Sequence, residues 1–376
     1  MTKEGQKMHI GFISTHIDSG KGGIARYSYE LIKNLNIIDK ENEYYLIHNK
    51  INNHVQFFNK NILLKSPFPD TIWRFSVAPI MLKYLNHLDL VHDPYPIGPL
   101  SFNMPFKKIV TVCDLAHIFF PKTATIELKL SHRIFLSKTL SNADKIIAIS
   151  QSTRNDLKNY LKIPEEKIQV IYLGVDECFK QLSDQEIDNI KIKYNIQYPF
   201  ILYVGGLEPR KNIPTLIKSF YKIKRRGIRH KMVLTGKRSW NYTKIFDCIR
   251  QLNLQKEIIY LEYIPDEDLP ALYNAADLFI YPSIYEGFGF PPLEAMACGT
   301  PVITSNTSSL PEVVGNAGIM ANPRDVNDIA NALNEVLSNE DLKYDMVKKG
   351  LEQAKKFKWI TCAKETLKNY EKVINS

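Results

Sequence analysis

The segment that decides the fold reads Glu286-Gly-Phe-Gly-Phe-Pro-Pro-Leu-Glu294 and continues as Ala295-Met-Ala-Cys-Gly299. A strand-like apolar run, residues 278–283, precedes it, and the proline pair and Gly299 are placed to begin and end a helix. The two glycines between the carboxylates allow a ligand to approach the backbone closely, and a helix N-terminus attracts phosphate. We therefore predict a strand, a ligand-binding loop and a helix with Glu294 in its first turn. The pattern suits a phosphorylated ligand that has hydroxyl groups at both ends, with one carboxylate for each set.

Length and composition are those of a globular protein with two domains. The chain has 376 residues, of which 44% are hydrophobic and 24% are charged. No apolar run is long enough to span a bilayer, and the polar start does not resemble a signal peptide. The five cysteines are scattered without paired spacing, which favours reduced thiols in a cytoplasmic protein over a disulfide framework or a zinc site.

The net charge of +9 indicates an anionic partner or a basic solvated surface. Most of the excess falls in residues 1–180, and a basic first half could face an anionic membrane or a phosphorylated carrier. The sequence contains no zinc finger, no RNP-type motif and no block of like charge, so nucleic acid is not an expected partner. The expected location is the cytoplasm, including the inner face of the cell membrane.

The first half alternates apolar runs with helical patterns. Residues 9–14 are predicted as a buried strand, and a glycine-rich turn that contains Gly22 and Gly23 follows and enters a helix. Its spacing is not Gly-x-Gly-x-x-Gly, so a dinucleotide fingerprint is not supported. Further apolar runs are predicted as strands of one parallel sheet covered on both faces. These runs are residues 44–48, 88–92, 108–113, 145–150 and 168–173.

Residues 71–85 mix aromatic, basic and apolar side chains. A membrane-surface helix is one interpretation, but Pro79 interrupts the segment and its charge is sparse. We therefore predict a helix that packs on the core.

The second half begins with an apolar strand that leads to Gly205 and Gly206, then to Arg210 and Lys211, and then to a helix near Pro214. Two adjacent cations at such a turn are well placed to neutralise a diphosphate leaving group. The alternative is a solvated pair on a loop.

These motifs resemble those of retaining GT-B glycosyltransferases, in particular the large glycosyltransferase family four. The resemblance rests on two motifs, the Glu-x7-Glu segment from Glu286 to Glu294 and the run Gly-Gly-x-x-x-Arg-Lys-Asn from Gly205. The resemblance covers nearly the whole chain and is densest over 200–323. It implies an α/β protein of GT-B architecture, with two Rossmann-like domains that face a central cleft. Its parts would be an acceptor-side domain, a nucleotide-sugar domain and a C-terminal helix that returns to the first domain, at residues 1–180, 181–355 and 356–376.

The resemblance also implies the reaction. A hexose, with mannose favoured, would pass from a nucleotide diphosphate sugar, with a GDP-sugar favoured, to a hydroxyl group of a glycan or lipid-linked acceptor. Configuration would be retained by front-face attack, with the leaving phosphate taking the acceptor's proton, and neither a metal nor a cofactor would be needed. Such enzymes build cell-surface polysaccharide or glycolipid.

The resemblance assigns roles to individual residues. Arg210 and Lys211 would hold the diphosphate, Glu294 the ribose and Glu286 the hexose hydroxyls. The residues expected to bind the donor are Gly22, Gly23, Gly205, Gly206, Arg210, Lys211, Glu286, Gly287, Phe288, Gly289 and Glu294. The residues expected to act in catalysis are Glu286, Asp114, Arg210 and Lys211. Backbone contacts of Ser308, Ser309 and Leu310 with the nucleotide, and a packing role for Trp359, are also implied.

The chain departs from the family at one position. The family commonly has Thr-x-His-Asp after the strand at 108–113, and here Cys113 replaces the histidine while Asp114 is kept. A thiol cannot replace an imidazole in hydrogen bonding, so Asp114 and then His117 are the candidates for the polar group near the reacting carbon. Three other functions stay open. They are a sugar-nucleotide epimerase, a nicotinamide oxidoreductase, and a non-catalytic nucleotide- or carbohydrate-binding protein.

Overall fold

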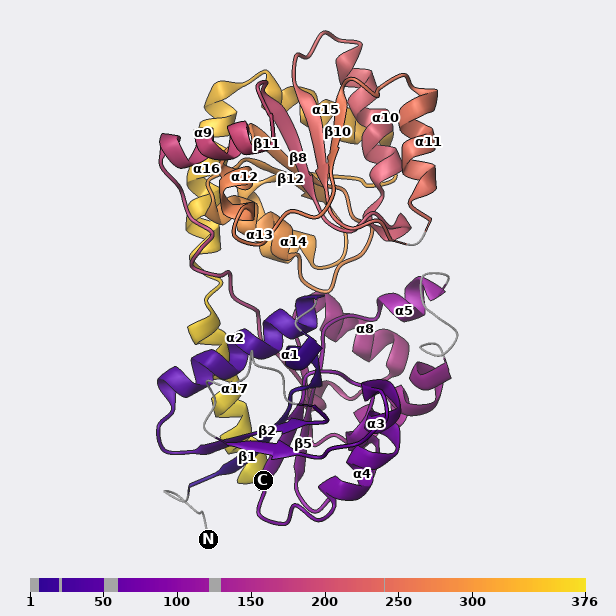
Figure 1. Cartoon of the computed structure of the whole chain (residues 1–376), viewed down its shortest axis with the longest axis vertical. Coiled ribbons are helices and arrows are strands. Elements are labelled where there is room, and N and C mark those ends of the chain that lie inside the picture. The colour runs from indigo at the N-terminus through magenta and orange to yellow at the C-terminus, as the bar shows by residue number, and fades with distance from the viewer. Residues whose placement is uncertain (1–6, 20–21, 51–59, 122–129, 240) are drawn as a thin grey trace. The chain divides into compact units, whose positions relative to one another are not determined.

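The structure is a computed structural model, and it describes residues 7–19, 22–50, 60–121, 130–239 and 241–376. The chain divides into two compact units (Figure 1). Unit 1 consists of Met1–Gly174 and Lys358–Ser376, and unit 2 is Val175–Phe357. The boundaries predicted from the sequence were 180/181 and 355/356. Residues 175–180 belong with unit 2, where Val175 N donates a hydrogen bond to Phe357 O at 3.1 Å.

The described strands of unit 1 form a seven-stranded parallel sheet in the order β3-β2-β1-β4-β5-β6-β7. The inner strands β1, β2, β4, β5 and β6 are mostly buried, and their buried side chains are largely apolar, as expected for a parallel sheet covered on both faces. The strands are β1 (His9–Ile13), β2 (Glu43–His48), β3 (Asn61–Leu63), β4 (Leu90–Asp93), β5 (Lys107–Val112), β6 (Lys145–Ala148) and β7 (Ile168–Val170). The prediction missed β3, a three-residue edge strand that is too short to show an apolar pattern.

The helices of unit 1 include the last helix of the chain. They are α1 (Thr15–Ser19), α2 (Gly22–Ile38), α3 (Asp70–Phe75), α4 (Val77–Leu82), α5 (Ala116–Phe119), α7 (Ser137–Asn142), α8 (Gln151–Leu161) and α17 (Trp359–Ile374). Helix α17, yellow in Figure 1, packs against α2. Its buried side chains include Trp359, Cys362, Ala363, Thr366 and Tyr370, which recur at helical spacing and form one face. The C-terminal helix therefore returns to the first unit, and Trp359 is a buried packing residue, as predicted.

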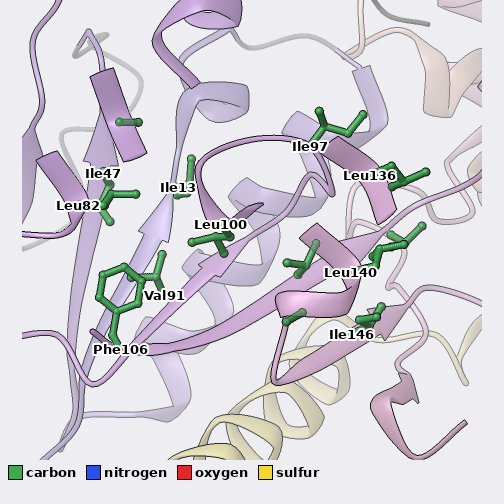
Figure 2. Packing of buried hydrophobic residues seen from close by; sticks show 14 of the residues in the cluster. Ile13, Ile47, Leu82, Val91, Ile97, Leu100, Phe106, Leu136, Leu140 and Ile146 are labelled. Atoms are coloured by element: carbon green, nitrogen blue, oxygen red, sulfur yellow. The ribbon is translucent and has the colours of Figure 1, made fainter. Parts of the chain in front are cut away.

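One core cluster of unit 1 joins the sheet to the helices after β3 and before β6 (Figure 2). Ile13, Val91 and Ile146 come from three of its strands, and Leu82 and Leu140 come from helices. Trp73 is fully buried, which agrees with a core-packing role for residues 71–85. The segment is nevertheless two short helices, α3 and α4, which meet at Ser76 rather than at Pro79.

The described strands of unit 2 form a six-stranded parallel sheet in the order β10-β9-β8-β11-β12-β13. They are β8 (Phe200–Val204), β9 (Lys231–Thr235), β10 (Ile258–Leu261), β11 (Leu278–Tyr281), β12 (Val302–Ser305) and β13 (Ile319–Ala321). The helices are α9 (Asp184–Lys193), α10 (Ile213–Lys224), α11 (Thr243–Gln251), α12 (Leu269–Asn274), α13 (Phe290–Ala297), α14 (Leu310–Val314), α15 (Val326–Leu337) and α16 (Glu340–Ala354). The carboxyl ends of β8, β11 and β12 are neighbours, and they bring together loops that are far apart in the sequence.

Among the described residues, the helices are all too short or too polar to cross a membrane.

Candidate active site

The site in unit 2 is built on the loops that follow β8, β11 and β12. The loop after β8 carries Arg210 and Lys211, the loop after β11 carries Glu286, and the loop after β12 carries Ser308 and Ser309. Because these strands are parallel neighbours, their carboxyl ends meet at one edge of the sheet. This is the edge at which open α/β sheets bind ligands.

Glu286 is the centre of this site. One carboxylate oxygen, Oε1, lies 2.6 Å from Lys211 Nζ and accepts a hydrogen bond from Ser283 Oγ at 2.5 Å. The other, Oε2, lies 2.9 Å from Arg210 Nη1. All three charged side chains are at most 15% exposed. Both cations predicted for a diphosphate are therefore paired with the predicted sugar-binding carboxylate.

The charge of Glu286 is set by these partners. Burial by itself raises the pKa of a carboxyl group, but the charges of Lys211 and Arg210 and the hydrogen bonds from Lys211 and Ser283 lower the pKa of Glu286 to about 2. At neutral pH Glu286 is an anion that accepts hydrogen bonds. It cannot serve as a general acid in this state.

The cations are also held by other groups. Arg210 donates to Tyr285 O at 2.6 Å and to Glu208 Oε1 at 2.7 Å. Lys211 Nζ lies 2.5 Å from Tyr281 Oη and 5.0 Å from the centre of the Tyr281 ring. These contacts fix the position of both charges, and such preorganisation favours electrostatic stabilisation of a leaving group.

Asn212, the last residue of the Arg-Lys-Asn run, has a backbone conformation that suits asparagine. It has φ +60, a left-handed conformation that asparagine tolerates better than most residues. Its Nδ2 donates to Pro282 O at 3.2 Å and to Pro323 O at 2.6 Å. Asn212 thus ties the loop of the cations to the loop that leads to Glu286.

Two glycines near the cations are required by packing. Gly205 has φ +154, and a Cβ there would lie 2.9 Å from Tyr203 Oη. Gly236, at the end of β9, has φ +138, and a Cβ there would lie 2.0 Å from Gly205 O. The loops after β8 and β9 therefore touch backbone to backbone at Gly205. Gly206 has more room, because its nearest neighbour would be Ser239 Oγ at 3.4 Å.

The loop between the two carboxylates is closed by Gly289. It precedes α13 with φ +120, and a Cβ there would lie 2.8 Å from Leu310 Cδ2. Ser309 Oγ lies 2.9 Å from Glu286 O and 2.6 Å from Phe288 O, and Ser308 Oγ accepts from Glu286 N at 2.9 Å. The hydroxyl groups of Ser308 and Ser309 thus hold the Gly287 loop in place.

Phe288 and Glu294 are both buried. Phe288 is buried, with its ring edge-to-face against Phe290 and Phe357 at 5.5 and 5.7 Å between centroids. Glu294 is 4% exposed, and Tyr273 Oη donates to its Oε2 at 2.9 Å. The prediction that Glu294 lies in the first helical turn is wrong. The helix begins at Phe290, with Gly289 before it, so Glu294 falls in the second turn.

The remaining predicted residues belong to unit 1. Gly22 begins α2 with φ +82, and a Cβ there would meet nothing within 4 Å. Gly23 is the second residue of the same helix. Asp114 follows β5, and its Oδ1 accepts from Ala116 N at 2.9 Å at the start of α5. Burial raises the pKa of the neighbouring Cys113 thiol, which keeps it protonated at neutral pH.

The sequence interpretation missed Ser283, Tyr281 and Tyr273 as partners of the charged groups. Ser283 lies two residues after the end of β11, so a hydroxyl at the carboxyl end of a buried strand was an available signal. The two tyrosines lie inside apolar runs, where nothing local marks a phenol that reaches a charged group.

Models of known protein families match both halves of the chain. The family model described as "Glycosyltransferase Family 4" matches residues 21–178, and the one described as "Glycosyl transferases group 1" matches residues 184–353. O-antigen chain mannosyltransferase B of Escherichia coli is 31% identical over 380 residues, which is 97% of this chain and all of that protein. The chain belongs to glycosyltransferase family 4.

Two further comparisons concern the sequence and the fold respectively. The serotype-specific mannosyltransferase WbdA of Escherichia coli is 31% identical over 308 residues, which is 80% of this glycosyltransferase and 38% of WbdA. The solved structure of HepE from Anabaena in complex with UDP and glucose has a TM-score of 0.78 and 19% identity, over 96% of this chain and 99% of that one. That likeness concerns the fold, and it confirms the GT-B architecture of two Rossmann-like domains predicted from the sequence.

Proposed function

We propose that this glycosyltransferase moves a hexose from a nucleotide diphosphate sugar to a hydroxyl group of a glycan or lipid-linked acceptor, with retained configuration. The observation that carries the proposal is the buried cluster of Arg210, Lys211 and Glu286 at the carboxyl edge of the second sheet. Two fixed cations beside an ionised carboxylate suit a ligand with a diphosphate next to sugar hydroxyls.

Mannose is the proposed sugar, and GDP-mannose the proposed donor. The full-length relative and WbdA are both named as mannosyltransferases, the first of O-antigen chains. We accordingly place the reaction in the synthesis of a cell-surface polysaccharide or glycolipid.

In this proposal the bound diphosphate shares the cations that Glu286 holds in this structure. Arg210 and Lys211 turn part of their hydrogen bonding toward the diphosphate, and Glu286 then accepts hydrogen bonds from hexose hydroxyls. Glu294 takes the ribose hydroxyls. Backbone groups at Gly205, Gly206, Gly287 and Gly289 approach the donor.

The remaining residues keep the roles that the resemblance implies. Phe288 packs beside the donor loop. Gly22 and Gly23 bind the donor, and Asp114 acts near the reacting carbon.

The chemical step forms one bond and breaks one. The acceptor oxygen attacks the anomeric carbon from the face that the phosphate leaves, and the carbon–oxygen bond to the phosphate breaks with its electron pair going to the phosphate oxygen. The acceptor's proton passes to that oxygen. Arg210 and Lys211 stabilise the charge that develops there, and exclusion of water prevents hydrolysis of the donor. Glu286 is not proposed as a nucleophile.

Neither a metal nor a cofactor is needed in this proposal, because two fixed side-chain cations supply the positive charge at the diphosphate. The Asp-x-Asp of the sequence, Asp266 to Asp268, does not suit a metal-bound nucleotide, because Asp268 is paired with Lys193 at 2.6 Å. Transfer should therefore persist at the same rate in the presence of EDTA.

The experiment begins with a thermal-shift panel of GDP, UDP, ADP and their common sugar conjugates, without added metal. Stabilisation by the GDP series alone is expected, followed by mannosyl transfer to a glycan primer with an α-linked product seen by NMR. A product of inverted configuration would contradict retention. Stabilisation by UDP compounds alone would mean that the donor is a UDP-sugar and not a GDP-sugar. Donor that is bound but never consumed with any acceptor would instead support the non-catalytic binding protein.

We further propose that the enzyme acts in the cytoplasm at an anionic membrane surface, since its net charge is +9. Co-sedimentation with vesicles that contain anionic lipid, and not with neutral vesicles, is the expected result. Equal binding to both would remove the electrostatic argument.

A further inference from the structure

The two carboxylates of the segment from Glu286 to Glu294 are held by different kinds of group. Glu286 lies against Lys211 and Arg210, whereas Glu294 Oε2 accepts a hydrogen bond from Tyr273 Oη at 2.9 Å. Both members of this second pair are buried, since Tyr273 is inaccessible to solvent and Glu294 is 4% exposed. A carboxylate is costly to bury unless it is hydrogen-bonded, so the phenol stabilises Glu294 inside unit 2.

The surroundings of Tyr273 fix its position. The residue belongs to helix α12, which packs against α13 (Figure 1). Its ring lies edge-to-face against Phe279 of β11 and against Phe179, at 5.4 and 5.9 Å between centroids. Its main-chain O accepts a hydrogen bond at 2.7 Å from Thr300 Oγ1, shortly after the end of α13. Both the phenol and the backbone of Tyr273 are therefore attached to the α13 segment.

The phenol acts as a hydrogen-bond donor in this pair. Burial raises the pKa of Tyr273 well above its ordinary value, and the charge of Glu294 and the hydrogen bond to it raise the pKa further. The O–H group therefore stays protonated at neutral pH. A carboxylate has about four acceptor positions on its two oxygens, and the phenol occupies one of them. The contact thus sets the direction of the carboxylate of Glu294 without adding a positive charge beside it.

A set direction matters for the ligand that Glu294 is proposed to bind. The 2′- and 3′-hydroxyl groups of ribose are neighbours, so one carboxylate can accept a hydrogen bond from each when its plane faces both. A carboxylate that rotates freely loses conformational entropy when such a ligand binds. Tyr273 restricts this rotation before the ligand arrives, and this preorganisation favours binding.

We propose that Tyr273 is a positioning residue for ribose recognition. Its O–H group holds the carboxylate of Glu294 in the direction that accepts hydrogen bonds from the ribose hydroxyl groups. Tyr273 thereby sets the preference of the enzyme for ribonucleotides over 2′-deoxyribonucleotides, and it acts through Glu294 rather than by touching the donor. The inference rests on the proposed function, in which Glu294 takes the ribose hydroxyls.

The test uses the full-length enzyme and nucleotides that differ only at the ribose. Tyr273→Phe keeps the ring and removes the donor, and Glu294→Gln removes the carboxylate. Tyr194→Phe is the matched control, because Tyr194 Oη also donates to a carboxylate of unit 2, at 2.5 Å from Asp268 Oδ2. Calorimetry gives the Kd of GDP and of 2′-deoxy-GDP, and UDP and 2′-deoxy-UDP are measured in parallel.

The wild-type enzyme should bind GDP at least about tenfold more tightly than 2′-deoxy-GDP, as expected for one hydrogen bond between a hydroxyl and a charged group. In Tyr273→Phe this ratio should fall to about threefold or less, because the carboxylate is no longer held in place. Tyr194→Phe should keep the wild-type ratio. Adding Tyr273→Phe to Glu294→Gln should lower the ratio no further, because Tyr273 acts through Glu294.

A purely structural role for Tyr273 predicts different results. Loss of packing would weaken the binding of both nucleotides equally, and the ratio would keep its wild-type value. In transfer assays a smaller fraction of active enzyme would lower kcat at constant KM, whereas the proposed role raises the KM of GDP-mannose at constant kcat. An unchanged ratio in Tyr273→Phe would overturn the inference. Equal affinities of the wild-type enzyme for the two nucleotides would overturn it as well.

A measurement on the wild-type protein keeps the inference testable if Tyr273→Phe does not fold. NMR resonances of isotope-labelled tyrosine Cζ atoms are recorded while GDP or 2′-deoxy-GDP is added. GDP should shift the resonance of Tyr273 more than 2′-deoxy-GDP does, and neither should shift that of Tyr194. Equal shifts at Tyr273, or none, would contradict the inference. Absence of binding by every nucleoside diphosphate and nucleotide sugar would contradict the proposed function instead.

Discussion

At the scale of single residues, Glu286 decides how the site is charged. Its carboxylate lies 2.6 Å from Lys211 and 2.9 Å from Arg210, so the three side chains form one buried cluster with a net charge of about +1. In the proposed reaction, a bound diphosphate competes with Glu286 for both cations. The donor and this carboxylate are therefore coupled, and the coupling can be measured.

Replacing Glu286 by glutamine should abolish transfer and spare nucleotide binding. The amide keeps the shape but releases Arg210 and Lys211, so the affinity for GDP should stay the same or rise, while transfer should fall at least about a hundredfold. Calorimetry with GDP and an assay of donor consumption check this. Glu340→Gln, at a side chain that is 82% exposed, is the control. Wild-type turnover in the Glu286 variant would refute its role.

Wild type and the Glu286→Gln variant should differ in their stability at acidic pH. The pKa of Glu286 is about 2 in the folded protein, against 4.5 for an unperturbed glutamate carboxyl group. Its contribution to the free energy of unfolding is thus complete above pH 4.5 and is lost as the pH falls toward 2. It amounts to about 3 kcal/mol. Urea unfolding of wild type and Glu286→Gln between pH 7 and pH 3 should show the gap narrowing only below pH 4.5. A gap that is constant over this range would contradict the ionised state.

At the scale of elements, the loops after the strands position these groups. Gly289 allows the chain to turn from the Glu286 loop into α13, with φ +120 and Leu310 packed against it. In unit 1, α17 is held to the sheet by a buried chain of polar contacts. Tyr370 Oη lies 2.7 Å from His92 Nδ1, and His92 Nε2 lies 2.8 Å from Thr111 Oγ1.

Gly289→Ala should destabilise unit 2 more than Gly227→Ala. Both glycines have positive φ, but a Cβ at Gly289 meets Leu310 at 2.8 Å, whereas a Cβ at Gly227 meets nothing within 4 Å. We expect a loss of about 1–3 kcal/mol at Gly289 and about 1 kcal/mol or less at Gly227. Thermal and urea unfolding measure both. Equal losses would show that backbone strain alone, and not the contact with Leu310, limits this position.

Tyr370→Phe should loosen α17. The substitution keeps the ring and leaves His92 Nδ1 buried without its partner, which should cost about 1–2 kcal/mol of unfolding free energy. Tyr344→Phe, at a tyrosine that is 75% exposed, should change nothing measurable. Urea unfolding of the two variants compares them. A silent Tyr370 variant would show that apolar packing alone holds the helix.

At the scale of the whole molecule, the chain enters unit 2 at residue 175 and leaves it at residue 357, so unit 2 is continuous and unit 1 is not. The face of α17 that carries Trp359 and Tyr370 belongs to the core of unit 1. A fragment of unit 1 without α17 would expose this part of its core to water.

The fragment 175–357 should therefore fold by itself and melt cooperatively, whereas the fragment 1–174 should not. Adding the peptide 358–376 to the second fragment should restore a cooperative melt, because it returns the buried face of α17 to α2. Circular dichroism melting curves decide the matter. A cooperative melt of 1–174 alone would mean that α17 contributes little to the fold of unit 1.

The sequence by itself determined the features that depend on near neighbours. Apolar runs predicted most of the described strands, and the glycines and charges after them predicted the loops that carry the site. The two motifs at Gly205 and Glu286 indicated the family, which the relatives then confirmed. The errors of the sequence-based prediction also concern short segments. The strand β3 is too short to show a pattern, and α13 begins at Phe290, one residue before the prolines, so Glu294 falls in its second turn.

Only the tertiary structure decided which groups meet. Glu286 pairs with Lys211, 75 positions away, because β8 and β11 are neighbours in the sheet, and no local pattern encodes that order. The contact of His117 with His132 and that of His92 with Tyr370 likewise join distant segments. The physical reason is that strand and helix preferences act over a few residues. Burial, charge pairing and pKa depend on packing between elements that the chain brings together only when it folds.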